Sequence, residues 1–327
     1  MLTRRHLLAA SAAGLVAAGP SVRALAQAIK KPVHIIVGFP AGGGADMIAR
    51  ILADLLRGPY ASTVLVENKP GAGARIAVES VKNAEADGSV MLFTPDFPIT
   101  VYPSSLRSLN YDPLRDFTPV APAAKSMLTY NVGPAVPASV KTLADFVQWC
   151  KQNPDKATFA TTAAGGTPHF VGVMLANAAG VPITPVHYRG GAPALQDLLG
   201  GHVPAGVNPI SESLPHARAG TLRMLAVTGS RRSPFLPDVP TMREQGYDVV
   251  IDSWLGVFVP VKTPEDAVNA LSAAIGEASR SAQMVENLAK VGNEPTFQTP
   301  AEFAATVKAD IARWSPVVKA SGFVAED

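Results

Sequence analysis

Cysteine and aromatic residues are scarce in this sequence, and each shortage excludes a class of protein. The one cysteine, Cys150, cannot form an internal disulfide. It lies in the helical pattern Thr142–Lys151, where we expect a small buried hydrophobe, since no base that would activate the thiol is indicated nearby. Aromatic residues are 6% of the chain, so a surface that stacks nucleic-acid bases is not expected.

Excess charge and long apolar runs are missing as well. The chain has 28 Lys and Arg and 26 Asp and Glu among 327 residues, and a basic surplus of two is too small to indicate a nucleic-acid partner. Its apolar stretch Leu7–Ala18 is shorter than the about 20 residues that a membrane-spanning helix needs. No longer apolar segment follows it, so no membrane-spanning helix is expected.

The first residues predict an export signal instead. The pair Arg4-Arg5 precedes the apolar stretch, Gly19-Pro20 ends it, and Ala24-Leu25-Ala26 fits a small-residue cleavage site. We therefore predict that residues 1–26 are a signal peptide, cleaved near Ala26, and that the mature protein is periplasmic. The arginine pair is twin-arginine-like. The general secretory route stays open, and a short buried helix is the alternative interpretation.

Strands and helices alternate at the start of the predicted mature chain. This order predicts an α/β unit with a parallel sheet and right-handed crossovers. The helices are indicated by apolar residues three and four apart, and the strands by short apolar runs. The expected strands are Val33–Phe39, Val64–Glu67 and Val90–Thr94, and the expected helices are Asp46–Leu56 and Ala74–Ala84.

A second α/β unit follows a proline-rich stretch, residues 95–122, which we expect to be irregular. The second unit repeats the alternation and carries its own glycine loop between a strand and a helix. The expected strands are Met127–Val132, Thr158–Thr161, Ile183–Val186, His202–Val207 and Arg223–Thr228, and the expected helices are Leu143–Gln152, Phe170–Ala179, Ala192–Leu199 and Leu214–Ala219.

The C-terminal segments complete the first unit in this interpretation. A strand at Gly256–Val259 and helices at Pro264–Lys290 and Pro300–Ser321 have no sheet of their own nearby, so we predict that they return to pack on the first unit. Domain 1 then comprises residues 27–125 and 250–327, and domain 2 comprises residues 126–249. Two crossings between the domains predict a hinge with a ligand cleft.

The first glycine loop reads Phe-Pro-Ala-Gly-Gly-Gly-Ala-Asp over Phe39–Asp46. A phosphate loop needs a lysine after its last glycine, and a dinucleotide loop needs a glycine where Met47 stands. What remains is an anion site, because the first N–H groups of a helix lack partners and carry the positive end of its dipole. Asp46 is expected to bond backbone N–H groups in that first turn rather than face the anion.

The second glycine loop, Ala163–Pro168, has the same setting between a strand and a helix. One such loop is also typical of a plain turn that binds nothing. Two of them, one in each domain and facing a hinge, favour binding. A carboxylate would suit backbone donors of this kind.

The chain resembles the Bug-type extracytoplasmic solute receptors of the tripartite tricarboxylate transporter family. The resemblance begins with Gly38–Asp46 and Arg50 and extends over nearly the whole predicted mature chain. It implies a type II-like, two-lobed periplasmic binding protein fold with no cofactor and no metal. The further segments that carry it, in the family's order, are Val66–Gly73, Ala86–Gly88, Tyr111–Phe117, Gly166–His169, Tyr188–Ala194, Leu225–Thr228, Leu236–Gly246 and Thr263-Pro264.

The resemblance also implies a binding site for a small organic carboxylate between the lobes, held largely by backbone groups. The implied contacts are Ala41, Gly42, Gly43, Gly44, Ala45 and Asp46 in the first loop, Thr162, Ala163, Gly166, Thr167 and His169 in the second, Gly190, Gly191 and Ala192 in the next, and Asn208. His169 could equally brace its loop. The histidines show no metal-ligand spacing.

The chain departs from the family pattern at three places, one of which is Val261-Lys262, which precedes Thr263-Pro264 where a pair of small residues is more usual. Ala164 stands where a glycine is usual, which predicts a stiffer second loop. Asn208 stands where receptors for amino acids can carry an aspartate that meets the ligand's ammonium group. A neutral amide there argues against a zwitterionic ligand.

The predicted function is a periplasmic receptor that delivers a carboxylate to inner-membrane permease subunits of the tripartite tricarboxylate type. Presentation of the ligand to a sensor kinase is an alternative that the sequence does not separate from transport. An exported hydrolase is disfavoured because no G-x-S-x-G motif occurs. Ser211 and Ser213 lie near His216, but no acid is placed to orient that histidine.

Overall fold

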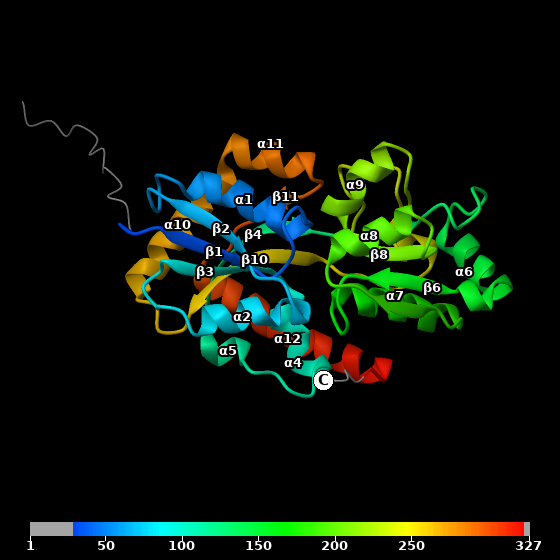
Figure 1. Cartoon of the computed structure of the whole chain (residues 1–327), viewed down its shortest axis with the longest axis horizontal. Coiled ribbons are helices and arrows are strands. Elements are labelled where there is room, and N and C mark those ends of the chain that lie inside the picture. The colour runs from blue at the N-terminus through cyan, green and yellow to red at the C-terminus, as the bar shows by residue number, and fades with distance from the viewer. Residues whose placement is uncertain (1–28, 324–327) are drawn as a thin grey trace, which may run out of the picture.

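The computed structural model describes residues 29–323, so the predicted signal peptide lies outside the described residues. Two β-sheets, each covered by helices, lie side by side along the long axis of the molecule (Figure 1). The first sheet has six strands in the order β11-β4-β10-β3-β1-β2, and the second has five in the order β7-β6-β8-β5-β9.

The first sheet is parallel at one side and antiparallel at the other. Strand β1 pairs in parallel with both β2 and β3, as the alternation predicted, whereas β10 is antiparallel to β3 and β4, and β11 is antiparallel to β4. The bounds are β1 Val33–Val37, β2 Val64–Asn68, β3 Val90–Pro95, β4 Phe117–Ser126, β10 Ser253–Pro260 and β11 Glu294–Pro295.

Successive side chains of β1 enter two different hydrophobic cores. Val33, Ile35 and Val37 pack under helices α1, α10 and α11, whereas Ile36 packs on the opposite face under α2 and α12. Both faces of the sheet are therefore covered, which explains the nearly continuous apolar run of this strand. The helix bounds are α1 Gly44–Leu56, α2 Arg75–Lys82, α10 Glu265–Arg280, α11 Ala282–Lys290 and α12 Pro300–Ser321.

The C-terminal helices return to the first sheet, as expected, and α12 also contacts α7 (Thr167–Ala179) of the second unit. Both α10 and α12 pack against β4 of the first sheet, and the two flank that sheet in Figure 1. The single helix predicted over Pro264–Lys290 is wrong, however, because the chain breaks at Ser281. The Ser281 hydroxyl accepts a hydrogen bond from the Met284 N–H and so caps the start of α11.

The irregular stretch predicted for residues 95–122 is also wrong. It contains three short helices, α3 Phe97–Thr100, α4 Tyr102–Ser105 and α5 Pro113–Asp116, and the first half of β4. Each helix has a proline in its first two positions, where the missing N–H costs no hydrogen bond. The β4 prolines, Pro119 and Pro122, lie at the two register shifts between β4 and β10.

The second sheet mixes parallel and antiparallel pairs. Strand β6 is parallel to β7 and β8, whereas β5 is antiparallel to β8 and β9. Their bounds are β5 Leu128–Val132, β6 Thr158–Thr161, β7 Thr184–His187, β8 Ala205–Pro209 and β9 Arg223–Val227. The helices are α6 Leu143–Gln152, α7 Thr167–Ala179, α8 Gly191–Leu199 and α9 Ile210–Arg218, and single 3-10 turns cover Ala72–Ala74, Pro154–Lys156 and Arg243–Gln245.

The chain passes between the sheets at two adjacent places. Strand β4 ends at Ser126 and β5 begins at Leu128, so the first crossing is one residue long. The return leads from β9 into β10, whose first residue, Ser253, pairs with Ser126. We call the part built on the first sheet lobe 1 and the part built on the second sheet lobe 2. The domain boundaries at residues 125/126 and 249/250 stay predictions.

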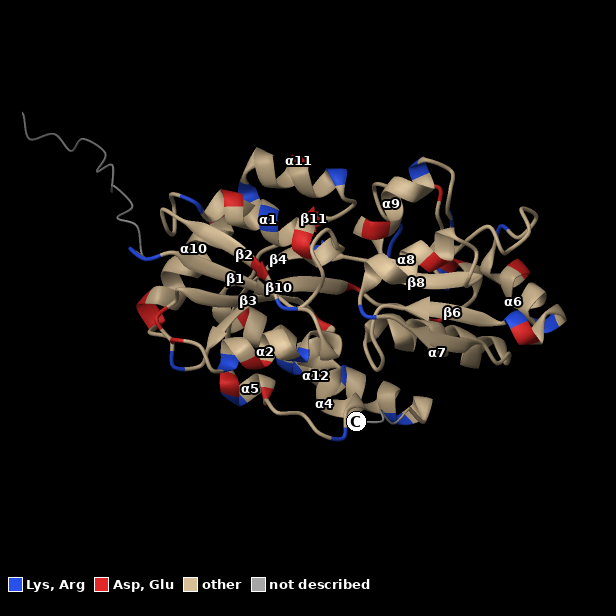
Figure 2. Cartoon of the chain, in the orientation of Figure 1, with Lys and Arg blue, Asp and Glu red and all other residues tan. Residues whose placement is uncertain are grey.

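Acidic and basic side chains are interspersed over both lobes (Figure 2). None of the helices in the described part of the chain combines the length and the apolar character that a membrane crossing requires.

Candidate ligand site between the lobes

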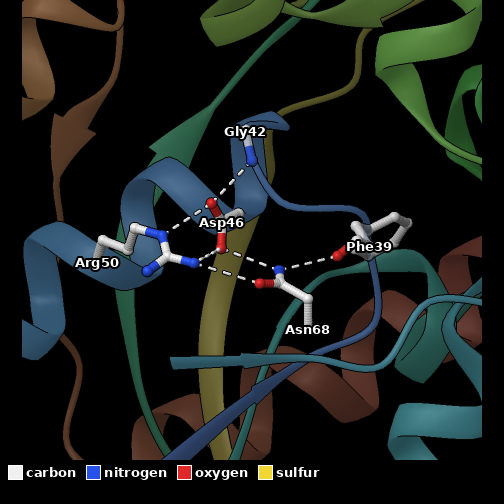
Figure 3. Close-up of polar contacts among 5 residues, drawn as sticks. All are labelled: Phe39, Gly42, Asp46, Arg50 and Asn68. Carbon is white, nitrogen blue, oxygen red and sulfur yellow. Dashed lines mark hydrogen bonds and ion pairs between the residues drawn. The ribbon is translucent and has the colours of Figure 1, made fainter. Parts of the chain in front are cut away.

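The first glycine loop is held by a polar network at the start of α1 (Figure 3). The buried Asp46 carboxylate accepts hydrogen bonds from the Gly42 N–H and the Asn68 amide, each at 2.9 Å. Arg50, one turn further along the helix, donates to both carboxylate oxygens at 2.9 Å. The Asn68 amide also donates to the Phe39 carbonyl at 3.0 Å. The network therefore fixes both ends of the loop.

The charge state of Asp46 follows from these contacts. Burial alone would raise the pKa of Asp46, but the Arg50 guanidinium, the Gly42 N–H and the Asn68 amide together hold it below its ordinary value. The predicted bond from Asp46 to a backbone N–H of its own loop is thus confirmed. Both oxygens of its carboxylate are hydrogen-bonded within lobe 1, and these bonds hold the glycine loop in place.

The second glycine loop is braced by His169. This side chain is 2% exposed, and its Nδ1 accepts a hydrogen bond from the Gly165 N–H at 2.9 Å. Burial, together with the neighbouring His187, lowers the pKa of His169 to about 4. The imidazole is therefore neutral at physiological pH and acts as an acceptor for the loop.

The third loop, between β7 and α8, is tied to the second. The Gly190 N–H donates to the Thr162 carbonyl at 3.0 Å. Gly190 has φ +109, and a Cβ there would lie 3.1 Å from Pro40 of the first loop. Lobe 1 and lobe 2 therefore approach each other closely at this point, and the glycine leaves room for that approach.

A narrow cavity of about 60 Å³ lies between the lobes. The first turns of α1, α7, α8 and α9 line it: Gly44 and Ala45 of α1 from lobe 1, and Thr167 of α7, Gly191 of α8, and Ser211 and Glu212 of α9 from lobe 2. The N-termini of these four helices, drawn from both lobes, therefore meet at one cavity, and those of α1, α7 and α8 follow glycine loops. Free N–H groups and the positive ends of helix dipoles favour an anion at such a place.

The cavity unites about half of the residues that the sequence pointed to. Gly43, Gly44, Ala45, Thr162, Thr167, Gly191 and Ala192 line it. Ala163 and Gly190 line an adjoining open groove of about 800 Å³, which shares Phe39, Pro40 and Thr162 with the cavity. Neither space is lined by Ala41, Gly42, Asp46, Gly166, His169 or Asn208.

Several cavity residues were missed by the sequence interpretation. The apolar walls include Phe39 and Phe97, whose rings meet edge to face at 5.9 Å between centroids. Two acids, Asp96 and Glu212, also line the cavity. A signal for Asp96 exists, because it directly follows β3, and the carboxyl ends of parallel strands are the usual place for binding residues. No comparable signal marks Glu212.

The lobes touch around the cavity through polar contacts. The Gly44 N–H of α1 donates to Glu212 Oε1 of α9 at 3.2 Å. The Ser105 hydroxyl of α4 donates to the Gly165 carbonyl at 2.9 Å. On another side, Arg231 and Glu294 form an ion pair at 2.7 Å. These contacts define an arrangement in which the two lobes are closed on each other.

Ser213 and Cys150, which were considered as catalytic nucleophiles, have structural roles in lobe 2. Ser213 accepts hydrogen bonds from Thr129 and Asn131 in the lobe 2 core. Cys150 is buried, as predicted, and burial raises its pKa to about 12. Among residues 29–323, no group of three or more His, Cys, Asp or Glu is placed to hold a metal ion.

Two lobes, each an α/β sheet with helix N-termini directed at a shared cavity, define a two-lobed solute-binding protein. Residues 48–323 match the family described as "Tripartite tricarboxylate transporter family receptor". The chain belongs to this family. The family resemblance and the two-lobed periplasmic binding protein fold inferred from the sequence are therefore confirmed.

Individual relatives cover nearly the whole chain. "Protein BugT" of Bordetella pertussis is 34% identical over 294 residues, which are 89% of this chain and 90% of that protein. The solved structure "R. palustris Rpa4515 with adipate" is 32% identical with a TM-score of 0.86, covering 90% of this chain and 98% of that one. The structure of the periplasmic binding protein BugD is 30% identical with a TM-score of 0.85, covering 91% and 99%.

Proposed function

We propose that this receptor captures a small carboxylate-containing solute in the cavity between its lobes and delivers it to permease subunits of the tripartite tricarboxylate type. The observation that carries the proposal is the meeting of the N-termini of α1, α7 and α8 at that cavity. Backbone N–H groups at helix starts bind carboxylates without a basic side chain. The related Rpa4515 structure, described as holding adipate, supports this ligand class.

Capture and release require the lobes to move apart. The free volume of about 60 Å³ is well below the roughly 300 Å³ at the lower end for ligand pockets. A solute therefore enters with the lobes separated and is enclosed when they close. Because it then touches donors of both lobes at once, it binds the closed state better and shifts the population toward that state.

The site is proposed to bind without chemistry. It needs no cofactor. Of the two serines near His216, Ser213 is hydrogen-bonded to Thr129 and Asn131 in the lobe 2 core, and Ser211 lines the cavity. The proposed location is the periplasm, reached after removal of residues 1–26 near Ala26. Presentation of the ligand to a sensor kinase remains the alternative to delivery to a permease.

Substitution in the first glycine loop tests the site. We expect Gly43→Asp to abolish binding of adipate, because its carboxylate would stand at the N-terminus of α1 and repel the ligand. Ser62→Asp adds the same charge to an exposed position before β2, at the far edge of the parallel sheet, and should bind like the parent protein. Calorimetric titration with adipate and related acids measures both.

Either of two results would contradict the proposal. One is Gly43→Asp with the affinity of the parent protein for the acid that the parent binds. The other is a parent protein that neither binds nor is thermally stabilised by any mono-, di- or tricarboxylate, since a ligand of the native state raises the melting temperature.

A further inference from the structure

Asp96 presents an unpartnered acceptor to the cavity. The residue follows β3 and is 2% exposed. Its Oδ1 accepts a hydrogen bond from the Thr167 hydroxyl of lobe 2 at 3.3 Å, whereas its Oδ2 is buried without a partner. Buried polar atoms without partners are uncommon and call for an explanation. A ligand group that donates a hydrogen bond would supply what Oδ2 lacks.

Glu212 repeats this arrangement from the other lobe. Its Oε1 accepts the Gly44 N–H, whereas its Oε2 is buried and without a partner. The carboxyl group lies between the first turns of α1 and α8, since a Cβ added at Gly191 would overlap it. Asn208, whose neutral amide we expected to argue against a zwitterionic ligand, does not line the cavity, but its side chain faces Glu212 and acts to lower the pKa of that acid.

The described lining of the cavity offers these two acids no basic side chain, although Ser253 in the lining and Arg313 outside it partly offset the effect of burial on the pKa of Asp96. Among the described residues that line it there is no lysine, arginine or histidine, and most of the others are apolar or glycine. Burial raises the pKa of Asp96 to about 7, and it also raises the pKa of Glu212, although the Gly44 N–H opposes that rise. An unpaired carboxylate in such surroundings is costly, and a cation beside it removes most of that cost.

We propose that Asp96 and Glu212 make this receptor selective for a ligand that carries a protonated amine as well as a carboxylate, that is, an amino acid or a related amino-carboxylate. The ammonium group donates to the free oxygens of Asp96 and Glu212. The ligand's carboxylate takes the helix N-termini of α7 and α8, and its apolar part contacts Phe39 and Phe97. This inference rests on the proposed function and narrows its ligand class.

Matched pairs of acids test the inference. The purified full-length protein is titrated calorimetrically with adipate and L-2-aminoadipate, succinate and L-aspartate, and pentanoate and L-norvaline. The members of each pair differ only by the amine. In the pair that binds most tightly, we expect the amino member to bind at least tenfold more tightly than its partner.

Three variants assign that preference to the two acids. Asp96→Asn and Glu212→Gln keep the size of each side chain and remove its charge, and each should reduce the ratio of affinities at least threefold. The double variant should bring the ratio close to one. Asp155→Asn removes the charge of an exposed acid in lobe 2 and should leave the ratio unchanged. Circular dichroism and thermal unfolding confirm that each variant folds.

The failures of the two proposals are distinguishable. If the plain acid of every pair binds as tightly as its amino partner, the amine inference is overturned while the carboxylate receptor stands. If the amine preference is real but survives in the double variant, the assignment to Asp96 and Glu212 is overturned. If no member of any pair binds, the proposed function and this inference both fail.

Discussion

Glu212 of lobe 2 accepts the backbone N–H of Gly44 in lobe 1, at 3.2 Å. A carboxylate of the protein itself thus occupies part of a helix N-terminus that faces the ligand cavity. The same carboxyl group leaves no space for a side chain at Gly191, where α8 begins. The Glu212 carboxyl therefore packs against two glycines, Gly44 across the lobe boundary and Gly191 within lobe 2.

The first prediction concerns Gly191. Gly191→Ala should weaken ligand binding roughly fivefold, because the added methyl group overlaps the flexible end of Glu212 and displaces this cavity-lining side chain. Helix propensity would favour alanine at this position, so a loss cannot be attributed to a weaker helix. The affinity for the tightest-binding acid, measured by calorimetry, checks the prediction.

The matched control for this prediction truncates Glu212, whose carboxyl the added methyl group would meet. Gly191→Ala combined with Glu212→Ala should recover part of the closure, measured by small-angle X-ray scattering as a return toward the compact shape of the parent protein. A single variant that binds and closes normally would show that the contact between Glu212 and Gly191 does not limit closure.

The second prediction concerns the pH dependence of stability at Asp96. The folded protein holds the Asp96 proton up to about pH 7, whereas the ordinary value is 3.8. The folded state thus binds more protons between these values, so the free energy of unfolding falls as pH rises from about 4 to about 7. Asp96→Asn should remove this loss and be more stable than the parent at pH 8, by about 4 kcal/mol at most.

Urea unfolding at several pH values measures this difference. The gain of Asp96→Asn should shrink as pH falls from 7 to about 4, and it vanishes below the ordinary value of 3.8, where the carboxyl is protonated in both states. Asp155→Asn, which changes an exposed acid, should follow the parent curve. A gain that is the same at pH 4 and pH 8 would mean that the Asp96 carboxyl is not protonated in the folded protein.

The third prediction concerns His169, which should make the protein less stable as pH falls, whereas Asp96 makes it less stable as pH rises. Its folded pKa of about 4 lies below the ordinary 6.5, so the unfolded chain binds more protons between these values. The free energy of unfolding therefore falls as pH drops from about 6.5 to about 4, by about 3 kcal/mol. His169→Gln keeps an acceptor for the Gly165 N–H and should flatten this part of the curve.

The neighbouring His187 limits how flat that curve becomes. Burial lowers its pKa as well, so part of the histidine contribution to acid sensitivity should persist in His169→Gln and be lost only when His187 is also replaced by Gln. Thermal unfolding between pH 4 and pH 7 measures each step. An unchanged slope in the double variant would contradict a neutral, buried His169.

The fourth prediction compares two ion pairs on one helix. Asp46→Asn should lower the free energy of unfolding by about 1–3 kcal/mol, because Arg50 and the Gly42 N–H lose a buried charged acceptor. Asp54→Asn removes the partner of Arg57, whose pairing is exposed, and should cost about 0.5 kcal/mol or less. Urea unfolding of both variants checks the contrast, and equal losses would contradict it.

The elements that were predicted accurately carry local signals. Helices α6 and α12 have the predicted bounds, and both begin with a capping box, formed by Thr142 with Asp145 and by Thr299 with Glu302. Strand β4 was missed because its evidence is not local. Its prolines oppose a strand assignment, and its partner β10 lies more than a hundred residues away in the sequence.

The residues of the site also fall into two groups, those with a local signal in the sequence and those without one. Glycine loops before helices are visible in the sequence, so the three helix starts that follow such loops at the cavity could be predicted. Asp96 and Glu212 could not be found in this way. Their role depends on contacts with residues of the opposite lobe, which are far away in the sequence. Asp96 gains Thr167, and Glu212 gains Gly44, each from the opposite lobe.

The two crossing strands also form part of the cavity wall. Ser126 and Ser253 pair with each other where the chain leaves and re-enters lobe 1, and both line the cavity. A captured solute therefore rests against the pivot on which the lobes turn. Because Met127 alone joins β4 to β5, we expect a small rotation there to move the distant rims of the lobes the most, which would make occupancy of the cavity detectable at the outer surface.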